Sequence, residues 1–446
     1  MTLAYAQQHY RWNFTFWVVE TSSWMFATAF IDSTTVLPVL VQALAGSPFL
    51  ASVIISIRYA GQGWPQLFAA SMVSGKVTRK AFFILSVIPG RLLLLWPMLL
   101  LLGGVTQPRV IMPAILLAYL AFWISEGFSI VPWVDMIGKT VPATRRGRLF
   151  GAMYAIGGLL GIIAGLSIRF LLANRPFPAN YGMLFLLAIV GLSLSTASIL
   201  LLREPPSPPE EERYSTWALI KDIPNLLRAM PQFRLLVMLQ ALFGFSVLPA
   251  PLYILLASAS LQHRAGVAAG SAAQSIGVGV FLALQTAGMI IGNVLWGYIS
   301  DRFGNRLLLR VLAIAHTFVP LTALLAGVLA AHDATTRVLY LTFGVTFFGY
   351  GGLLGGTWMG VTNFLLELAP AHDRPAYIAV TNALNIPAII LPLLGGLLLR
   401  PLGYTVIFLI AAAFLLYAAI LTRHLVEPRA SLARVHHPPP KPGEGA

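Results

Sequence analysis

The stretch Gly297-Tyr-Ile-Ser-Asp301-Arg302-Phe-Gly304-Asn-Arg306 decides the fold of this chain of 446 residues. It lies between two long apolar segments. A glycine ends the first segment, an aspartate and two arginines fill a short loop, and the next apolar run starts at once. Charges in so short a gap indicate a tight turn at a membrane surface, between two spanning helices.

Apolar residues dominate the whole composition. Hydrophobic residues make up 58% of the chain, charged residues 10%, and the mean hydropathy is +0.80. Soluble domains carry about 25% charged residues, so this surface does not face mainly water. Because about 20 residues cross the hydrocarbon core as a helix, the long apolar runs predict twelve spans. These are Phe14–Leu44, Phe49–Ser74, Ala81–Gly104, Val110–Gly138, Leu149–Ala173, Tyr181–Leu202, Phe233–Ser258, Gly270–Ile299, Leu307–Ala331, Val338–Leu368, Ala376–Leu399 and Gly403–Thr422.

The G-x-x-x-D-R-x-G-x-R spacing of the opening stretch resembles the loop signature of the major facilitator superfamily of secondary transporters. The resemblance implies an all-α membrane protein with 12 transmembrane helices in two pseudo-symmetric six-helix bundles. It also implies that Gly297, Asp301, Arg302, Gly304 and Arg306 form a gating loop on the cytoplasmic side. The function it implies is transport by alternating access.

Two loops support an internal repeat at an offset of 226 residues. The offset carries the signature loop onto the short basic loop that ends at Lys80, and Arg374 onto Arg148. We therefore expect an N-terminal bundle over 1–202 and a C-terminal bundle over 232–424. A cytoplasmic linker with an interfacial amphipathic helix should occupy 203–231, and a disordered cytoplasmic tail 425–446.

The net charge of +14 follows membrane orientation rather than nucleic-acid binding. With both termini inside, the predicted inner side holds 21 Lys and Arg residues, the outer side holds six, and all five Lys are inside. This is the positive-inside bias. We expect a multi-pass protein of the plasma (inner) membrane of a prokaryote, with both termini in the cytoplasm.

Charged residues inside the predicted spans are the clearest functional signal, because a charge in the bilayer needs a partner or a wet cavity. Asp32 and Arg58 fall at the same depth on neighbouring spans, which predicts an intramembrane ion pair. Glu20 and Glu126 are candidate proton carriers, although either also suits a hydrogen-bonded structural role. Arg91 suits a counter-ion to one of these acids or a contact for an anionic substrate group.

Uncharged polar and aromatic residues on several spans predict a substrate cavity. Pro387 and Pro392 are expected to interrupt the eleventh span, and the glycines in 349–356 to loosen the tenth. The cavity candidates are Trp24, Tyr59, Gln62, Trp123, Gln240, Gln285, Tyr350, Trp358, Asn363, Asn382 and Asn385.

The sequence favours a transporter over other membrane functions. It lacks cysteine, a phosphate-binding G-x-x-x-x-G-K-[ST] loop and an H-E-x-x-H metal signature. We therefore expect no catalytic residues, no metal and no cofactor. The expected partners are a small organic solute that can be amphipathic, protons and the lipid bilayer, with the protein a monomer. A non-transporting sensor or assembly scaffold on the same fold is the alternative.

Overall fold

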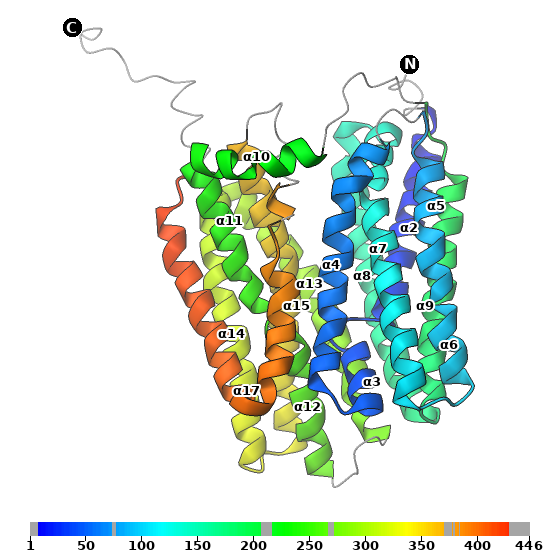
Figure 1. Cartoon of the computed structure of the whole chain (residues 1–446), viewed down its shortest axis with the longest axis vertical. Coiled ribbons are helices and arrows are strands. Elements are labelled where there is room, and N and C mark those ends of the chain that lie inside the picture. The colour runs from blue at the N-terminus through cyan, green and yellow to red at the C-terminus, as the bar shows by residue number, and fades with distance from the viewer. Residues whose placement is uncertain are drawn as a thin grey trace, which may run out of the picture.

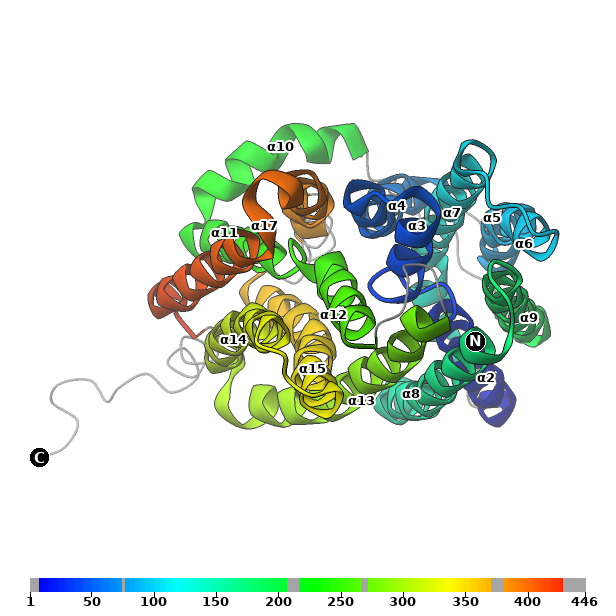
Figure 2. The ribbon, with the colours of Figure 1, turned by 90° about the horizontal axis from the view of Figure 1, so that it is seen from below.

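The computed structural model describes residues 8–73, 77–206, 216–265, 272–369, 377, 380–382 and 384–427, and within them all regular structure is helical. The long helices form two groups that stand side by side (Figures 1 and 2). The first group consists of α2 (Tyr10–Ala29), α3 (Val36–Ala45), α4 (Pro48–Val73), α5 (Lys80–Leu93), α6 (Leu95–Leu102), α7 (Pro108–Thr140), α8 (Ala143–Asn174) and α9 (Ala179–Leu201).

The second group follows a helix that lies across one end of the molecule. That helix is α10 (Thr216–Ala229), and we call the end it covers the linker end (Figure 1). The opposite end, where α3 and α12 lie, is the far end. The second group consists of α11 (Pro231–Phe243), α12 (Ala250–Ala265), α13 (Ala272–Phe303), α14 (Asn305–Ala331), α15 (Thr336–Leu368) and α17 (Pro387–Leu421).

Nine helical segments of the described chain are long and apolar enough to cross a membrane. The last of them, Val380–His424, is 45 residues long and contains the eleventh and twelfth predicted spans. Its helix changes direction at Gly403, whose φ of 71° suits glycine. Nine segments are compatible with the expected twelve spans for two reasons. The first two predicted spans are covered by α2 to α4, which are not among the nine, and the last segment holds two spans.

Several predicted spans are broken in mid-course. Turns at residues 30–35 interrupt the first span between α2 and α3, and a turn at Leu94 interrupts the third between α5 and α6. A short 3₁₀ turn, Gly244–Ser246, interrupts the seventh between α11 and α12. The predicted loosening of the tenth span is wrong, because α15 is continuous from Thr336 to Leu368. Its glycines instead allow α13 to approach closely, and the Trp296 indole N–H donates to the Gly352 carbonyl at 2.6 Å.

Pro387 and Pro392 lie at different places in one helix. Pro387 begins α17, where a proline needs no hydrogen-bond donor, and Pro392 lies inside the helix. The two groups of helices meet along α8 and α13 and along α4 and α17. Small residues permit these contacts: Gly165 lies against Gly279, and Gly396 against Ser52.

The segment between the two groups of helices lies where the linker was expected, and it contains a helix. α9 ends at Leu201, α10 covers Thr216–Ala229 and α11 begins at Pro231. We retain the division into two bundles, a linker and a tail as a proposal. Residues 207–215 of the linker and 428–446 of the expected disordered tail lie outside the described part of the chain.

Candidate functional site

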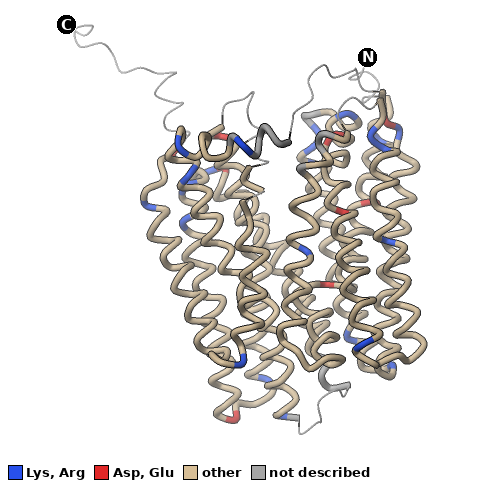
Figure 3. Tube along the Cα trace, in the orientation of Figure 1, with Lys and Arg blue, Asp and Glu red and all other residues tan. Residues whose placement is uncertain are grey.

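Charged side chains gather at the two ends of the molecule, and few lie between them (Figure 3). Three of the interior ones are deeply buried in the first group of helices. Glu20 on α2 is 3% exposed, Arg91 on α5 is 7% exposed and Glu126 on α7 is 6% exposed. All three were predicted from the sequence, and the structure brings them together.

Arg91 and Glu126 form a buried ion pair. The Arg91 Nε lies 2.9 Å from the Glu126 Oε1. The other carboxylate oxygen of Glu126, Oε2, accepts a hydrogen bond from the indole N–H of Trp24 at 2.9 Å. Both oxygens of this carboxylate are therefore held by fixed donors. Trp24, a predicted cavity residue, is therefore a hydrogen-bond donor to the ion pair.

Glu20 is held by neutral donors alone. Its Oε2 accepts hydrogen bonds from the Thr21 hydroxyl at 2.8 Å and from the Trp133 indole N–H at 3.0 Å. Its Oε1 accepts from the Ser195 hydroxyl at 3.2 Å. No cation lies within ion-pair distance of Glu20 in the described chain.

Arg91 links the two carboxylates through α9. Its Nη1 donates to the Leu192 carbonyl at 2.9 Å, to the Thr196 hydroxyl at 2.7 Å and to the Ser195 hydroxyl at 3.3 Å. Since Ser195 in turn donates to Glu20, a continuous chain of hydrogen bonds joins Glu126 to Glu20. The second terminal nitrogen of Arg91, Nη2, is buried without an acceptor.

Glycines set the spacing of the helices that carry this network. Gly90 packs so closely on α7 that a Cβ there would lie 2.6 Å from the Ala121 carbonyl oxygen, and its N–H donates to Ser125 at 3.1 Å. Gly127 packs with the same closeness on Gly61 of α4. Each glycine adjoins a network residue in sequence. A larger side chain at Gly90 would push α5 away from α7 and so move Arg91 away from Glu126, whereas one at Gly127 would push α7 away from α4.

The predicted ion pair between Asp32 and Arg58 is wrong as a direct contact. The Asp32 Oδ1 accepts from the backbone N–H groups and hydroxyls of Thr34 and Thr35, at 2.6 to 2.8 Å. Arg58 donates to the Ser33 hydroxyl at 3.2 Å, and its guanidinium lies 5.1 Å from the centre of the Trp123 ring. The break between α2 and α3 turns the Asp32 carboxylate onto its own chain, where it holds the turn that precedes α3.

The other predicted cavity residues divide into four sets. Trp358 is 70% exposed and Asn382 is also exposed, and their place in a cavity stays a prediction. Gln240, Gln285 and Asn363 are hydrogen-bonded to Thr381, Thr34 and Ser300. Tyr59, Gln62 and Asn385 are partly buried. Trp123 and Tyr350 are buried, and they lie near Arg58.

The signature loop contacts the chain that follows the last helix. Gly304 has φ 86°, a conformation that favours glycine, and a Cβ there would lie 2.6 Å from the Glu427 carboxylate. The Glu427 Oε2 accepts from the backbone N–H of Arg306 at 2.9 Å, at the start of α14. Arg306 also donates from Nη2 to the Arg423 carbonyl at 3.1 Å. Asp301 and Arg302 are exposed, and Gly297 has open space beside it.

The first group has the same arrangement at the corresponding place. Glu204 follows α9, and its two carboxylate oxygens accept from the backbone N–H groups of Arg79 at 2.8 Å and Lys80 at 2.9 Å. Arg79 also pairs with Asp135 on α7 at 2.8 Å. Lys139 pairs with Asp135 and lies 3.8 Å from Glu204. In each group, a glutamate that follows the last helix holds the N-terminus of the helix after the loop.

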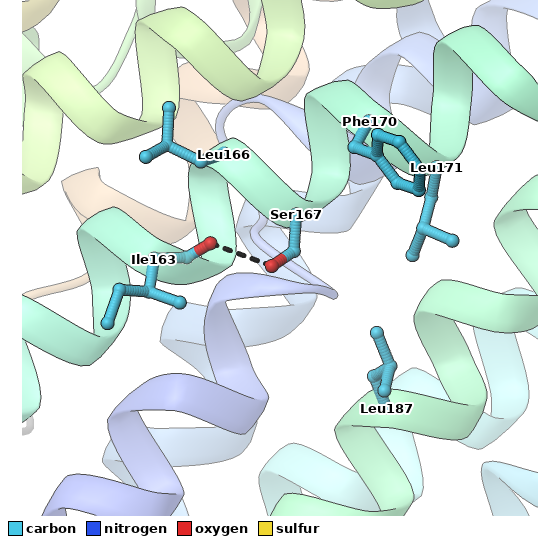
Figure 4. Close-up of a pocket in the computed structure, with 6 residues that line it drawn as sticks. All are labelled: Ile163, Leu166, Ser167, Phe170, Leu171 and Leu187. Carbon is cyan, nitrogen blue, oxygen red and sulfur yellow. Dashed lines mark hydrogen bonds between the residues drawn. The ribbon is translucent and has the colours of Figure 1, made fainter.

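A hollow on the outer surface is lined by no charged side chain. It lies between α8 and α9, and the only polar side chain in it, Ser167, donates to the Ile163 carbonyl at 2.8 Å (Figure 4). Its other lining residues are apolar: Leu166, Phe170, Leu171 and Leu187. This surface suits lipid tails. Among the described residues, no group of three or more His, Cys, Asp or Glu side chains could hold a metal ion.

Sequence reasoning missed the neutral and terminal members of these sites. Trp133, Ser195 and Thr196 have no charge to draw attention inside an apolar span. Glu204 and Glu427 carry a signal that could have been used, since each is followed by proline just after the last predicted span of its half.

Comparison with known proteins gives one family. The family model of the Major Facilitator Superfamily matches residues 265–444. No curated protein matches the sequence.

Solved structures match the fold over nearly the whole chain. The nucleoside transporter NupG (D323A mutant) has a TM-score of 0.69 at 12% identity, covering 93% of this chain and 100% of its own. A bacterial homologue of the iron transporter ferroportin, in the inward-facing state, has a TM-score of 0.66 at 16% identity, with 92% and 98% coverage. The POT family transporter PepTSo has a TM-score of 0.69 at 11% identity, with 95% and 98% coverage. The signature loop lies within the part of the chain that matches the Major Facilitator Superfamily, and the whole chain shares the fold of these transporters.

Proposed function

We propose that this protein is a secondary active transporter that moves a small organic solute by alternating access and couples that movement to protons. The observation that carries the proposal is the buried network of Glu20, Arg91 and Glu126. Charges within a membrane-spanning bundle are costly and mark ion or substrate pathways. An inert scaffold has no use for three of them.

The charges of the network favour a proton as the coupled ion. When both carboxylates are ionised, one guanidinium balances only one of them, and the network carries a net negative charge. Binding of one proton makes it neutral. Arg91 already pairs directly with Glu126, so Glu20, which has only neutral donors, is the better proton carrier.

The contacts between the two groups of helices support alternating access. Gly165 lies against Gly279 and Gly396 against Ser52, nearer the far end than the linker end. A molecule closed there and reopened by rocking the two groups would expose its centre to each side in turn. We propose that the linker end faces the cytoplasm of a prokaryotic cell, in line with the positive-inside bias.

The signature loop is a proposed control point for that motion. We expect Asp301→Asn to slow transport and to favour conformers open at the linker end, while expression stays normal. Distances between spin labels on α4 and α15 would report the conformers. Wild-type turnover together with a wild-type distance distribution would remove Asp301 from the gating mechanism.

The test of transport is a flux screen in proteoliposomes, run with and without a pH gradient, with a pH-sensitive dye enclosed. Solute-dependent movement of protons in the wild type, lost in Glu20→Gln, is the expected result. Asp333→Asn is the matched control, because this acid is exposed in a loop at the far end. Solute flux that is equal with and without the gradient would contradict proton coupling, and a screen without any flux would contradict transport.

A further inference from the structure

Arg58 lies on α4 inside the membrane, without a carboxylate in direct contact. Its guanidinium donates one hydrogen bond to Ser33 at 3.2 Å and lies over the face of Trp123. Its Nε is buried and has no acceptor. A guanidinium held by a hydroxyl and an aromatic face still offers donors in a fork that fits carboxylate or phosphate oxygens.

Asp32 interacts electrostatically with Arg58, but its carboxylate is hydrogen-bonded elsewhere. Asp32 is close enough for its charge to act on Arg58, but four donors from Thr34 and Thr35 converge on its Oδ1. These bonds hold the turn between α2 and α3. Asp32 therefore lowers the cost of the buried cation from a distance and leaves the Nε donor of Arg58 unused.

A second unused donor comes from the other group of helices. Tyr350 on α15 is 1% exposed, and its hydroxyl is buried with no hydrogen-bond partner. It lies close enough to Arg58 and Tyr59 to interact with them electrostatically. A buried hydroxyl without a partner is costly, and this one belongs to the group of helices opposite the one that carries Arg58.

We propose that Arg58 and Tyr350 together bind the anionic oxygen group of the transported solute, a carboxylate or a phosphate. This inference rests on the proposed transport function. The anion accepts hydrogen bonds from the guanidinium and from the phenol hydroxyl, while the rings of Trp123 and Tyr59 flank the body of the solute. Because the two donors belong to different groups of helices, the bound anion ties the groups together.

The test measures binding by tryptophan fluorescence of the full-length protein in nanodiscs, since Trp123 lies against Arg58. The probes are matched anionic and neutral compounds: benzoate with benzamide, indole-3-acetate with indole-3-acetamide, and glucose 6-phosphate with glucose. We expect an anion of this set to bind and its neutral twin to bind about 10- to 100-fold more weakly, as for loss of a charged hydrogen bond. The successful pair distinguishes carboxylate from phosphate.

Variants assign the effect to the two residues. Arg58→Gln should weaken anion binding by about 10- to 100-fold and Tyr350→Phe by about 5-fold, whereas Arg175→Gln, at an exposed arginine, should leave it unchanged. If Arg58→Gln fails to fold, Arg58→Lys retains the charge, loses the fork and should still weaken binding. Neutral twins that bind as tightly as the anions, or an Arg58 variant that keeps wild-type affinity, would overturn the proposal.

Flux assays separate this inference from the proposed function. An anion that binds through Arg58 but is never moved across proteoliposomes supports the site and contradicts transport. A neutral solute that is transported equally well by the wild type and Arg58→Gln supports transport and contradicts the site.

Discussion

In the first group of helices Glu20, Arg91 and Glu126 meet in one buried network, whereas at the offset of 226 residues the second group has Ser246, Thr317 and Gly352. The three replacements are uncharged. Thr317 donates to the Ala313 carbonyl one turn back, and the Gly352 carbonyl accepts from Trp296. The same architecture therefore stands in the second group without any of these charges.

The fold therefore does not need the charged network. Two related bundles of helices meet the same packing demands, yet among the described residues the buried charged side chains lie in the first group. Such charges are expensive to hold in a membrane. We infer that the first group carries ion coupling and the second supplies neutral contacts, such as the Tyr350 hydroxyl. The second group also buries His316, which is hydrogen-bonded to Thr357 at 2.8 Å.

At the linker end, in contrast, the two groups of helices share the same contact. Glu204 and Glu427 each hold the start of the helix that follows the loop, and each precedes a proline. A feature kept in both halves belongs to the shared mechanics of the fold. A feature present in one half belongs to its particular function.

Loss of Arg91 should have the largest effect. Arg91→Gln strands two buried carboxylates, and removing one partner of a buried pair costs about 3–5 kcal/mol of unfolding free energy. Thr317→Ala, at the corresponding position, removes only a local hydrogen bond and should cost about 1 kcal/mol. Melting temperatures in nanodiscs compare the two variants, and equal losses would remove the distinction between the halves.

Replacing Glu20 should separate stability from coupling. Glu20→Gln leaves the Arg91–Glu126 pair intact and neutral, so the melting temperature should stay at or above that of the wild type. Proton movement, followed with a pH-sensitive dye, should disappear while solute exchange continues. Wild-type proton movement in this variant would move the coupling site elsewhere.

A pair of double-mutant cycles compares the two candidate ion pairs. Arg91 and Glu126 are in contact and should couple by about 1–3 kcal/mol, whereas Asp32 and Arg58 do not touch and should couple by about 0.5 kcal/mol or less. Unfolding free energies of the single variants Asp32→Asn and Arg58→Gln and of the double variant give the second value. A coupling as large as that of the first pair would mean that the two side chains meet in another conformation.

The smallest effects are expected at the linker end. Glu427→Gln should weaken the cap of α14 by about 1 kcal/mol, and Glu204→Gln should weaken that of α5 slightly more, because Lys139 also lies near Glu204. Hydrogen exchange of the Arg306 and Lys80 amides would report each loss locally. Unchanged protection at both amides would show that the glutamates do not hold these helices.

Much of the fold could be predicted because its signals are local. Long apolar runs and the spacing of Gly297 to Arg306 depend only on neighbours in sequence. The site could be predicted less well because contacts depend on how helices rotate and bend. Depth alone placed Asp32 level with Arg58, but the break after α2 turned the carboxylate away. Composition could not tell that Trp358 is exposed and Trp123 buried.

The sequence could not identify the partner of Arg91, because that contact also depends on how the helices pack. Glu20 and Glu126 were both within reach, and the choice between them depends on the close approach of α5 and α7 at Gly90. Glu427 was overlooked because the tail was treated as a disordered segment from residue 425. Its carboxylate is held against the signature loop.

The central claim, that a carboxylate of the first group carries the proton, can be tested without knowing the solute. Infrared difference spectroscopy of the protein in lipid, titrated over pH, detects the carbonyl stretch of a buried protonated carboxyl group. If Glu20 carries the proton, this band is present in the wild type and in Asp333→Asn and is lost in Glu20→Gln. A band that persists unchanged in both Glu20→Gln and Glu126→Gln would contradict it.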